Sequence, residues 1–331
     1  MSGDITRTSV PMFNVALSDK IEGGLIAGVT VLAGESKKFK SGFALFLASE
    51  YLKKYEDSVL LFYDSEFGTP KSYWEMFDIF GMNKAIHSPI TDIEMLKHDC
   101  MVQLKQWKRD DRLIVVVDSL GGLASVKEIE DTIAGKQVAD MTRAKSIKSF
   151  FRMATPLVNL LNIPMILINH VYKDQSGGNP KYAKNIVSGG TGPYLSADTI
   201  FLIGRQQEKE GDEITGFNFI LTIEKSRFVR EKAKIPINVT YDGGIKKWTG
   251  LFDIARELDW IKMPKSGWYQ LKDHVHDANF RRADVEYDES FWTKMLSNKH
   301  FVDDVEAHFK GKKTLVIVDD EVKREESSFD E

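Results

Sequence analysis

The sequence predicts an α/β fold in which helices cover both faces of a mostly parallel sheet. Short apolar runs such as "VTVLA", "VLLFYD", "LIVVVD" and "PMILIN" alternate with longer segments of helical period, which is typical of strands buried on both faces. The first run leads through a polar turn straight into an amphipathic helix, as strands do in alternating α/β proteins. With 331 residues, of which 42% are hydrophobic, the chain can bury one large core and a smaller module.

The elements follow in a regular order. Strands are expected at residues 29–33, 59–64, 113–118 and 164–170, and helices at 40–54, 71–80, 92–107 and 138–161. After residue 170 the sequence becomes rich in Gly, Lys and Asn and loses any clear period, which indicates a loop. Further strands are expected at 199–203, 217–224 and 234–241.

Composition divides the chain into four parts. These are a short N-terminal segment (1–20) that is a candidate subunit contact, an α/β core (21–250), a small C-terminal lid domain, helical or α/β (251–311), and a tail (312–331). From residue 319 on, the tail carries seven acidic and two basic residues, so we expect it to be disordered.

Features that would indicate secretion or membrane insertion are missing from the sequence. The start, "MSGDITRTSV", has no apolar signal region, and no apolar run approaches the roughly 18 residues of a membrane span. The single cysteine, Cys100, excludes an internal disulfide framework. We therefore predict a cytoplasmic protein.

Charge is unevenly distributed along the chain. The net charge is −4, yet residues 136–190 contain eight Lys or Arg and two Asp or Glu. A solvated basic face explains such a segment, and so does a surface that meets phosphates.

The turn after the first strand, "GESKKFKS" at 34–41, has the spacing of the Gly-x4-Gly-Lys-Ser/Thr phosphate loop. In such a loop backbone N–H groups surround the phosphates of ATP, Lys40 supplies a positive charge and the Ser41 hydroxyl binds Mg²⁺. Phe39 breaks the pattern, because glycine there normally permits an unusual backbone angle. The candidate nucleotide-binding residues of the loop are Gly34, Glu35, Ser36, Lys37, Lys38, Phe39, Lys40 and Ser41.

Polar residues follow three more strands. Asp64 and Glu66 close "LLFYDSEF", Asp118 closes "LIVVVD" and His170 closes "PMILINH". The carboxyl edge of an open α/β sheet is where ligands bind. Asp118 is therefore a candidate Mg²⁺ residue, Glu66 a candidate for aligning a water, and His170 a candidate sensor of the γ-phosphate. Surface carboxylates and a core histidine are the plainer alternatives for each residue alone.

Longer motifs resemble one family. "GESKKFKS", "LFYDSEFG", "VVVDSLGGLAS", "VADMTRAKS", "SGGTGPYLSADT" and "EKSR" are similar, in this order, to the RecA-type strand-exchange recombinases and most closely to the UvsX recombinases of T-even-type bacteriophages. The phosphate loop of UvsX recombinases also contains Phe-Lys-Ser, so Phe39 is typical of that family. The resemblance covers roughly residues 8–270.

The resemblance implies a RecA-like ATPase core, with ATP and Mg²⁺ as cofactors, that forms a helical filament on single-stranded DNA and pairs it with a homologous duplex. It places Tyr73 where the family stacks an aromatic ring on adenine, although ordinary helix packing also explains a tyrosine there. Lys225 and Arg227 fall where the family reaches into the neighbouring subunit's ATP; the alternative is an exposed basic strand edge. Together with Lys40, Glu66 and His170, these two form the expected catalytic set.

DNA contact is expected from two loops, about 125–137 and 171–190, and from the start of the helix between them. Lys145, Lys148 and Arg152 are spaced to form one stripe on that helix, which can neutralise phosphates without reading sequence. The full candidate set is Arg143, Lys145, Lys148, Arg152, Lys173, Lys181, Lys184, Gly189 and Gly190.

The resemblance has a limit at the N-terminal end. The family usually carries an N-terminal helix that packs on the next subunit, whereas here "TRTSVPMFNVALSD" begins almost at once, and residues 10–17 are the candidate for an edge contact.

Partners implied by the family are double-stranded DNA, a single-strand-binding protein and a recombination mediator. Two other functions stay open at this point: a hexameric helicase with a RecA-type core, and a non-catalytic recombinase paralogue.

Overall fold

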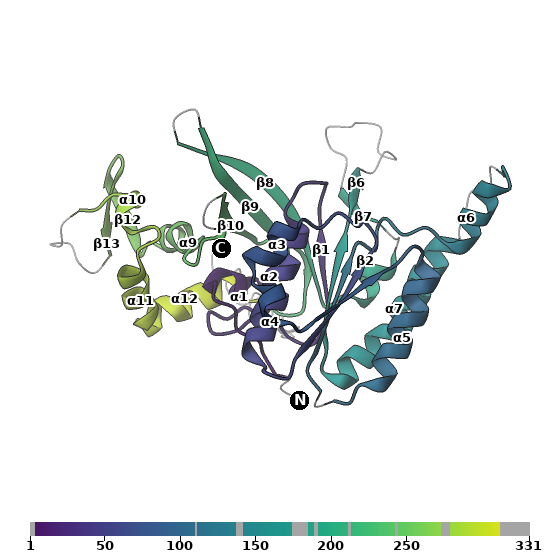
Figure 1. Cartoon of the computed structure of the whole chain (residues 1–331). Coiled ribbons are helices and arrows are strands. Elements are labelled where there is room, and N and C mark those ends of the chain that lie inside the picture. The colour runs from purple at the N-terminus through teal and green to yellow at the C-terminus, as the bar shows by residue number, and fades with distance from the viewer. Residues whose placement is uncertain are drawn as a thin grey trace, which may run out of the picture.

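A nine-stranded sheet in the order β11-β10-β9-β8-β1-β5-β4-β2-β3 forms the centre of the molecule (Figure 1). The computed structural model describes residues 4–109, 111–136, 142–173, 185–188, 191–210, 213–241, 244–272 and 279–311. Six strands run parallel: β1 (Gly28–Ala33), β2 (Val59–Asp64), β3 (Ala85–Pro89), β4 (Leu113–Asp118), β5 (Pro164–Asn169) and β8 (Thr199–Glu210). The antiparallel strands β9 (Glu213–Ser226), β10 (Lys234–Thr240) and β11 (Gly244–Ile245) complete it. The predicted mostly parallel α/β sheet is confirmed.

Helices cover both faces of the sheet. Successive residues of a strand point to opposite faces, and in the central strands the residues on both faces are apolar and need cover. Ile114 and Val116 of β4 join one buried cluster, and Val115 and Val117 join the other. The first cluster packs under α1 (Pro11–Ser18), α2 (Lys40–Lys54), α3 (Lys71–Met76) and α4 (Ile79–Met82), and the second under α5 (Ile93–Gln106), α7 (Thr142–Leu161) and α8 (Thr191–Ser196).

The structure differs from the sequence prediction in several local places. The helix expected at 71–80 is broken into α3 and α4, because Asp78 adopts a left-handed backbone with φ of 55°. β3 was not predicted. The first expected DNA loop contains a helix, α6 (Val126–Ile133), capped by the Ser125 side chain, and Figure 1 shows it extending away from the sheet. The second contains the hairpin strands β6 (Val171–Lys173) and β7 (Asn185–Val187).

The N-terminal segment packs inside its own chain. All eight residues of α1 are buried, and Met12 and Phe13 are fully inaccessible. The apolar side chains of residues 10–17 thus lie in the core of their own chain, where they are removed from water. The subunit contact expected of this segment stays a prediction.

The C-terminal part is mixed in structure. It contains α9 (Leu251–Glu257), β12 (Ile261–Lys265), β13 (Trp268–Leu271), α10 (Arg282–Val285), α11 (Glu289–Ser297) and α12 (Lys299–Phe309). Trp292 and Phe301 belong to the same buried cluster as α1 and α2. The part is thus packed continuously against the core. Of the helices in the described residues, none combines the length and hydropathy needed to cross a bilayer.

Candidate nucleotide site

The turn 34–39 links the end of β1 to the first residue of α2, as the motif requires. Phe39, in the place of the expected glycine, adopts the left-handed φ of 54° that a glycine would favour. Its ring packs against Phe43, Tyr73 and Phe219, with ring centroids 5.1 to 5.5 Å apart. These contacts compensate for the backbone strain. They also need Gly42, where an added Cβ would lie 2.4 Å from the Phe39 ring.

Lys40 points into the loop that precedes it. Only 7% of the residue is exposed, and its Nζ donates to the Glu35 carbonyl at 2.8 Å. Burial lowers the pKa of Lys40, while the negative charges of Glu66 and Asp118 partly offset that effect. A buried ammonium inside a turn of backbone N–H groups is well placed for a phosphate.

Ser41 and Asp118 come together as the sequence predicts. The Ser41 hydroxyl donates to Asp118 Oδ2 at 2.6 Å, and the Thr69 hydroxyl donates to the same oxygen at 3.2 Å. Burial raises the pKa of Asp118 to about 6. These hydroxyl and carboxylate oxygens are the hard ligands that Mg²⁺ prefers. In the described part of the chain no three His, Cys, Asp or Glu side chains are grouped so that they could hold a metal ion.

Glu66 lies between two other strand ends. Its Oε1 accepts from the Ser119 hydroxyl at 2.5 Å and lies 2.8 Å from His170 Nε2. Partial burial acts to raise the pKa of Glu66, but the contacts with Ser119 and His170 prevail and lower it. Glu66 is therefore an ionised, oriented carboxylate at the carboxyl edge of the sheet.

Asp64 has a different environment. Its Oδ1 accepts the backbone N–H groups of Glu66 and Phe67, and its Oδ2 lies 3.0 Å from His87 Nε2. Asp64 thus stabilises the turn that presents Glu66.

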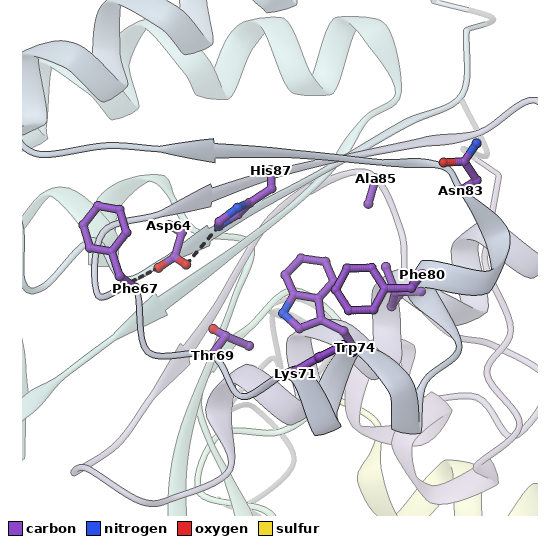
Figure 2. Close-up of a pocket in the computed structure, with 10 residues that line it drawn as sticks. Asp64, Phe67, Thr69, Lys71, Trp74, Phe80, Asn83, Ala85 and His87 are labelled. Atoms are coloured by element: carbon purple, nitrogen blue, oxygen red, sulfur yellow. Dashed lines mark hydrogen bonds and ion pairs between the residues drawn. The ribbon is translucent and has the colours of Figure 1, made fainter.

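Figure 2 shows Asp64 and His87 on the wall of a 440 Å³ pocket that also contains Trp74 and Phe80. The two rings are stacked with centroids 5.5 Å apart. Tyr73 does not line this pocket.

Tyr73 lines a separate 260 Å³ pocket beside the phosphate loop. Sequence reasoning missed most of its other walls, which come from α3, β8, β9 and the end of β10: Met76, Arg205, Phe217, Phe219 and Tyr241. Arg205 donates to the Lys37 carbonyl at 3.0 Å and lies 4.4 Å from the Phe217 ring centroid. An aromatic pocket next to the loop has the shape and chemistry for a nucleobase.

Lys225 and Arg227 do not lie at this site. In the sheet, Thr30 of β1 pairs with Thr199 of β8, and Thr199 pairs with Ser226 of β9. Arg227, the next residue, therefore lies level with Val29, near the amino end of β1. The phosphate loop begins after Ala33, at the opposite end of β1, roughly 13 Å further along the strand. Lys225 Nζ donates to the Tyr194 carbonyl at 2.5 Å.

The DNA candidates divide into four groups. Lys145, Lys148 and Arg152 are exposed on α7. Arg143 instead donates to the carbonyls of Leu123 and Gly121 at 2.6 and 2.5 Å, so its donors hold the segment before α6. Lys173 ends β6, and the remaining candidates lie outside the described residues: Lys181, Lys184, Gly189 and Gly190. The tail 312–331 also lies outside them.

Taken together, the parallel sheet, the loop with Lys40 and Ser41, and the carboxylates at neighbouring strand ends define the class of protein. It is an α/β protein with a RecA-like core.

Comparisons with known proteins name the family. A family model described as bacteriophage T4, recombination and repair protein, C-terminal domain, matches residues 248–305. The chain is 42% identical to the recombination and repair protein of Enterobacteria phage T4, over 93% of this chain and 79% of that protein. It is 26% identical to the RecA protein of Symbiobacterium thermophilum, over 80% and 74% of the two chains, and 24% identical to that of Clostridioides difficile, over 82% and 75%. The chain belongs to the UvsX family of phage recombination and repair proteins. These relatives do not favour a helicase or a non-catalytic paralogue.

Proposed function

We propose that the chain is an ATP-dependent DNA recombinase, which forms filaments on single-stranded DNA and pairs it with a homologous duplex. The observation that carries this proposal is the convergence of Lys40, the Ser41–Asp118 pair and the Glu66–His170 pair at one sheet edge, in a member of a recombination family.

In this proposal the loop 34–41 holds the phosphates of ATP, and the pocket around Tyr73 holds adenine. Ser41 and Asp118 would bind Mg²⁺, which supplies charge neutralisation for phosphoryl transfer when it is bound. Lys40 is already directed into the loop by its bond to Glu35.

Glu66 aligns the attacking water, and His170 connects it to the DNA-binding side. The Glu66 carboxylate is held from both sides by Ser119 and His170, as a positioned base should be. His170 directly precedes β6, and its carbonyl accepts the Ser188 N–H at 2.8 Å at the end of the paired strand β7. A change at the γ-phosphate can therefore be transmitted to this hairpin.

Lys225 and Arg227 act on the nucleotide of a neighbouring subunit. Their distance from the loop of their own chain supports a role in trans, since a finger must touch the transferred phosphoryl group. Turnover therefore requires assembly.

DNA lies along α7, where Lys145, Lys148 and Arg152 present exposed positive charge. Such contacts are independent of sequence, as a search for homology requires. The family also suggests a single-strand-binding protein and a mediator as partners, and the cytoplasm of the bacterial host as the place of action.

The test is joint-molecule formation between a labelled single strand and a homologous or heterologous duplex, with ATP and Mg²⁺. Joints that need both homology and ATP are expected. DNA-stimulated ATP hydrolysis without joints would point to a helicase, and the absence of both activities would point to a non-catalytic paralogue.

A further inference from the structure

Arg227 pairs with a buried carboxylate that the nucleotide site does not use. Its Nη2 lies 2.5 Å from Asp198 Oδ1; the Arg227 side chain is 63% exposed, whereas that of Asp198 is 5% exposed. Within the described residues Oδ1 is buried without a hydrogen-bond partner, so the ion pair with this guanidinium is what compensates its negative charge. The arginine is thus held at one nitrogen of its fork, while most of the side chain faces solvent.

Asp198 itself is rigidly fixed. Its Oδ2 accepts the Val29 N–H at 2.8 Å, and its own N–H donates to the Val29 carbonyl at 2.8 Å. The carboxylate also lies over Gly28, where an added Cβ would be 2.1 Å from Oδ2. A carboxylate fixed by the first residues of β1 gives Arg227 a defined direction relative to the whole sheet.

The same carboxylate influences the second cation of the "EKSR" segment. Burial lowers the pKa of Lys225, and the negative charge of Asp198 opposes that shift. Lys225 is held by the Tyr194 carbonyl of α8, and α8 ends two residues before Asp198. Both cations therefore contact the same short segment, Lys225 at Tyr194 and Arg227 at Asp198.

We propose that Asp198 is a positioning residue that holds the Arg227 guanidinium in the orientation in which it reaches the nucleotide of a neighbouring subunit. The inference rests on the trans role of Arg227 proposed above. One nitrogen remains on Asp198, and within the described residues the other donors of the planar fork can turn to phosphate oxygens. An arginine that is already oriented loses less conformational freedom when it makes that contact.

The first experiment compares Asp198→Asn with a matched control in DNA-stimulated ATP hydrolysis. Asparagine can still accept from Val29 but cannot pair with Arg227, so we expect kcat to fall ~10-fold or more while KM for ATP changes little. The control is Glu224→Gln, since Glu224 lies on the same strand and pairs with an exposed lysine, Lys232. It should leave kcat unchanged. An unchanged kcat in Asp198→Asn would overturn the proposal.

The second experiment separates positioning in trans from support of the same subunit's β1. Asp198→Asn is mixed with Glu66→Gln, which keeps Asp198 and Arg227 but lacks the carboxylate that aligns water. Where the ATP of an Asp198→Asn subunit meets Arg227 of a Glu66→Gln subunit, hydrolysis should recover. No recovery would mean that the Asp198→Asn substitution damages the nucleotide site of its own subunit, and would overturn the inference.

A parallel mixture of Arg227→Ala with Glu66→Gln tests the underlying trans role. Recovery is expected there too. If this mixture fails, the trans assignment of Arg227 is wrong; if it succeeds while the Asp198→Asn mixture fails, only the positioning role of Asp198 is wrong.

Discussion

Phe39 illustrates at the scale of one residue how the site departs from its motif. A left-handed backbone costs a residue other than glycine roughly 1 kcal/mol, and glycine at this position would avoid that cost. The phenylalanine ring instead lines the pocket that we assign to adenine, together with Tyr73 and Phe219. A side chain of the phosphate loop thereby becomes part of the wall around the base.

We predict that Phe39→Gly weakens ATP binding about 2- to 10-fold, because an aromatic pair is worth roughly 0.5–1.5 kcal/mol, and that it reduces discrimination between ATP and GTP. Affinities for both nucleotides from calorimetry check this. Phe80→Ala is the control, since Phe80 is an exposed ring in the neighbouring pocket (Figure 2). Tighter ATP binding by Phe39→Gly would contradict the assignment.

Glu66→Gln tests the residue that we propose aligns water. Glutamine can keep a hydrogen bond to Ser119 but carries no charge to activate a water, so we expect ATP and DNA binding to persist and kcat to fall by about 10²-fold or more. Nucleotide affinity and single-turnover hydrolysis measure the two separately. Loss of ATP affinity in this variant would show that Glu66 has a different role.

Asp118 makes stability depend on pH in a defined direction. Its pKa is about 6 in the folded chain, above the ordinary value of 3.8, so the folded state binds more protons between these values. Without divalent metal, stability should therefore fall as pH rises from about 4 to about 6, by at most ~3 kcal/mol from this group.

The measurement is the melting temperature in a chelator at pH 5 and pH 7. Asp118→Asn should remove this part of the difference. Mg²⁺ favours the ionised carboxylate, so it should raise the melting temperature more at pH 7 than at pH 5. An equal effect of Mg²⁺ at both values would count against Asp118 as a metal residue.

At the scale of elements, the sequence predicts best the strands that are buried on both faces. β2 and β4 have the expected bounds, and α2 begins at the expected Lys40. β3 escaped prediction because "AIHSP" is short, exposed and partly polar at the sheet edge. α6 was not predicted because none of its residues is buried, and the segment was interpreted as a loop.

The candidate site, too, is predictable from the sequence only in part. Residues at the ends of parallel strands, such as Glu66, Asp118 and His170, are predictable because topology brings those ends together. Arg205, Phe217 and Tyr241 lie on β8, on β9 and just after β10, in stretches without a motif, so only the folded sheet places them beside the phosphate loop. Arg143 was expected to contact DNA; its Nε and Nη2 donate to carbonyls within the chain, and a contact of this residue with DNA stays a prediction.

The stripe on α7 gives a prediction at this scale. Replacing Lys145, Lys148 or Arg152 by Ala should weaken single-stranded DNA binding for all sequences alike, and each substitution that removes one bound phosphate should reduce the salt slope by ~0.7. Fluorescence titrations at several salt concentrations measure the slope. Lys294→Ala on α11, an exposed lysine far along the chain, is the control. A sequence-dependent loss of affinity would contradict the assignment.

At the scale of the molecule, the C-terminal part and the core are one packed body. Trp292 and Phe301 share a buried cluster with Phe13 and Phe43. Backbone bonds add to this contact, since Gly311 donates to Phe228 and Arg230 donates to Phe309. The position of the "EKSR" segment is therefore fixed from two sides, by α8 and by the chain after α12.

In the mechanism that we propose, turnover is a property of the assembly. The loop that we assign to ATP and the cations Lys225 and Arg227 lie toward opposite ends of the sheet. If these two cations act in trans as proposed, an isolated subunit lacks the charge that they supply to the transition state. Missing arginine fingers reduce kcat by about 10³–10⁵-fold. We therefore predict that dilute protein without DNA binds ATP but hydrolyses it very slowly, and that the rate per subunit rises with protein concentration. Hydrolysis and light scattering, followed together over a dilution series, should increase in parallel. A rate per subunit that is constant across the series would mean that one chain contains the complete site.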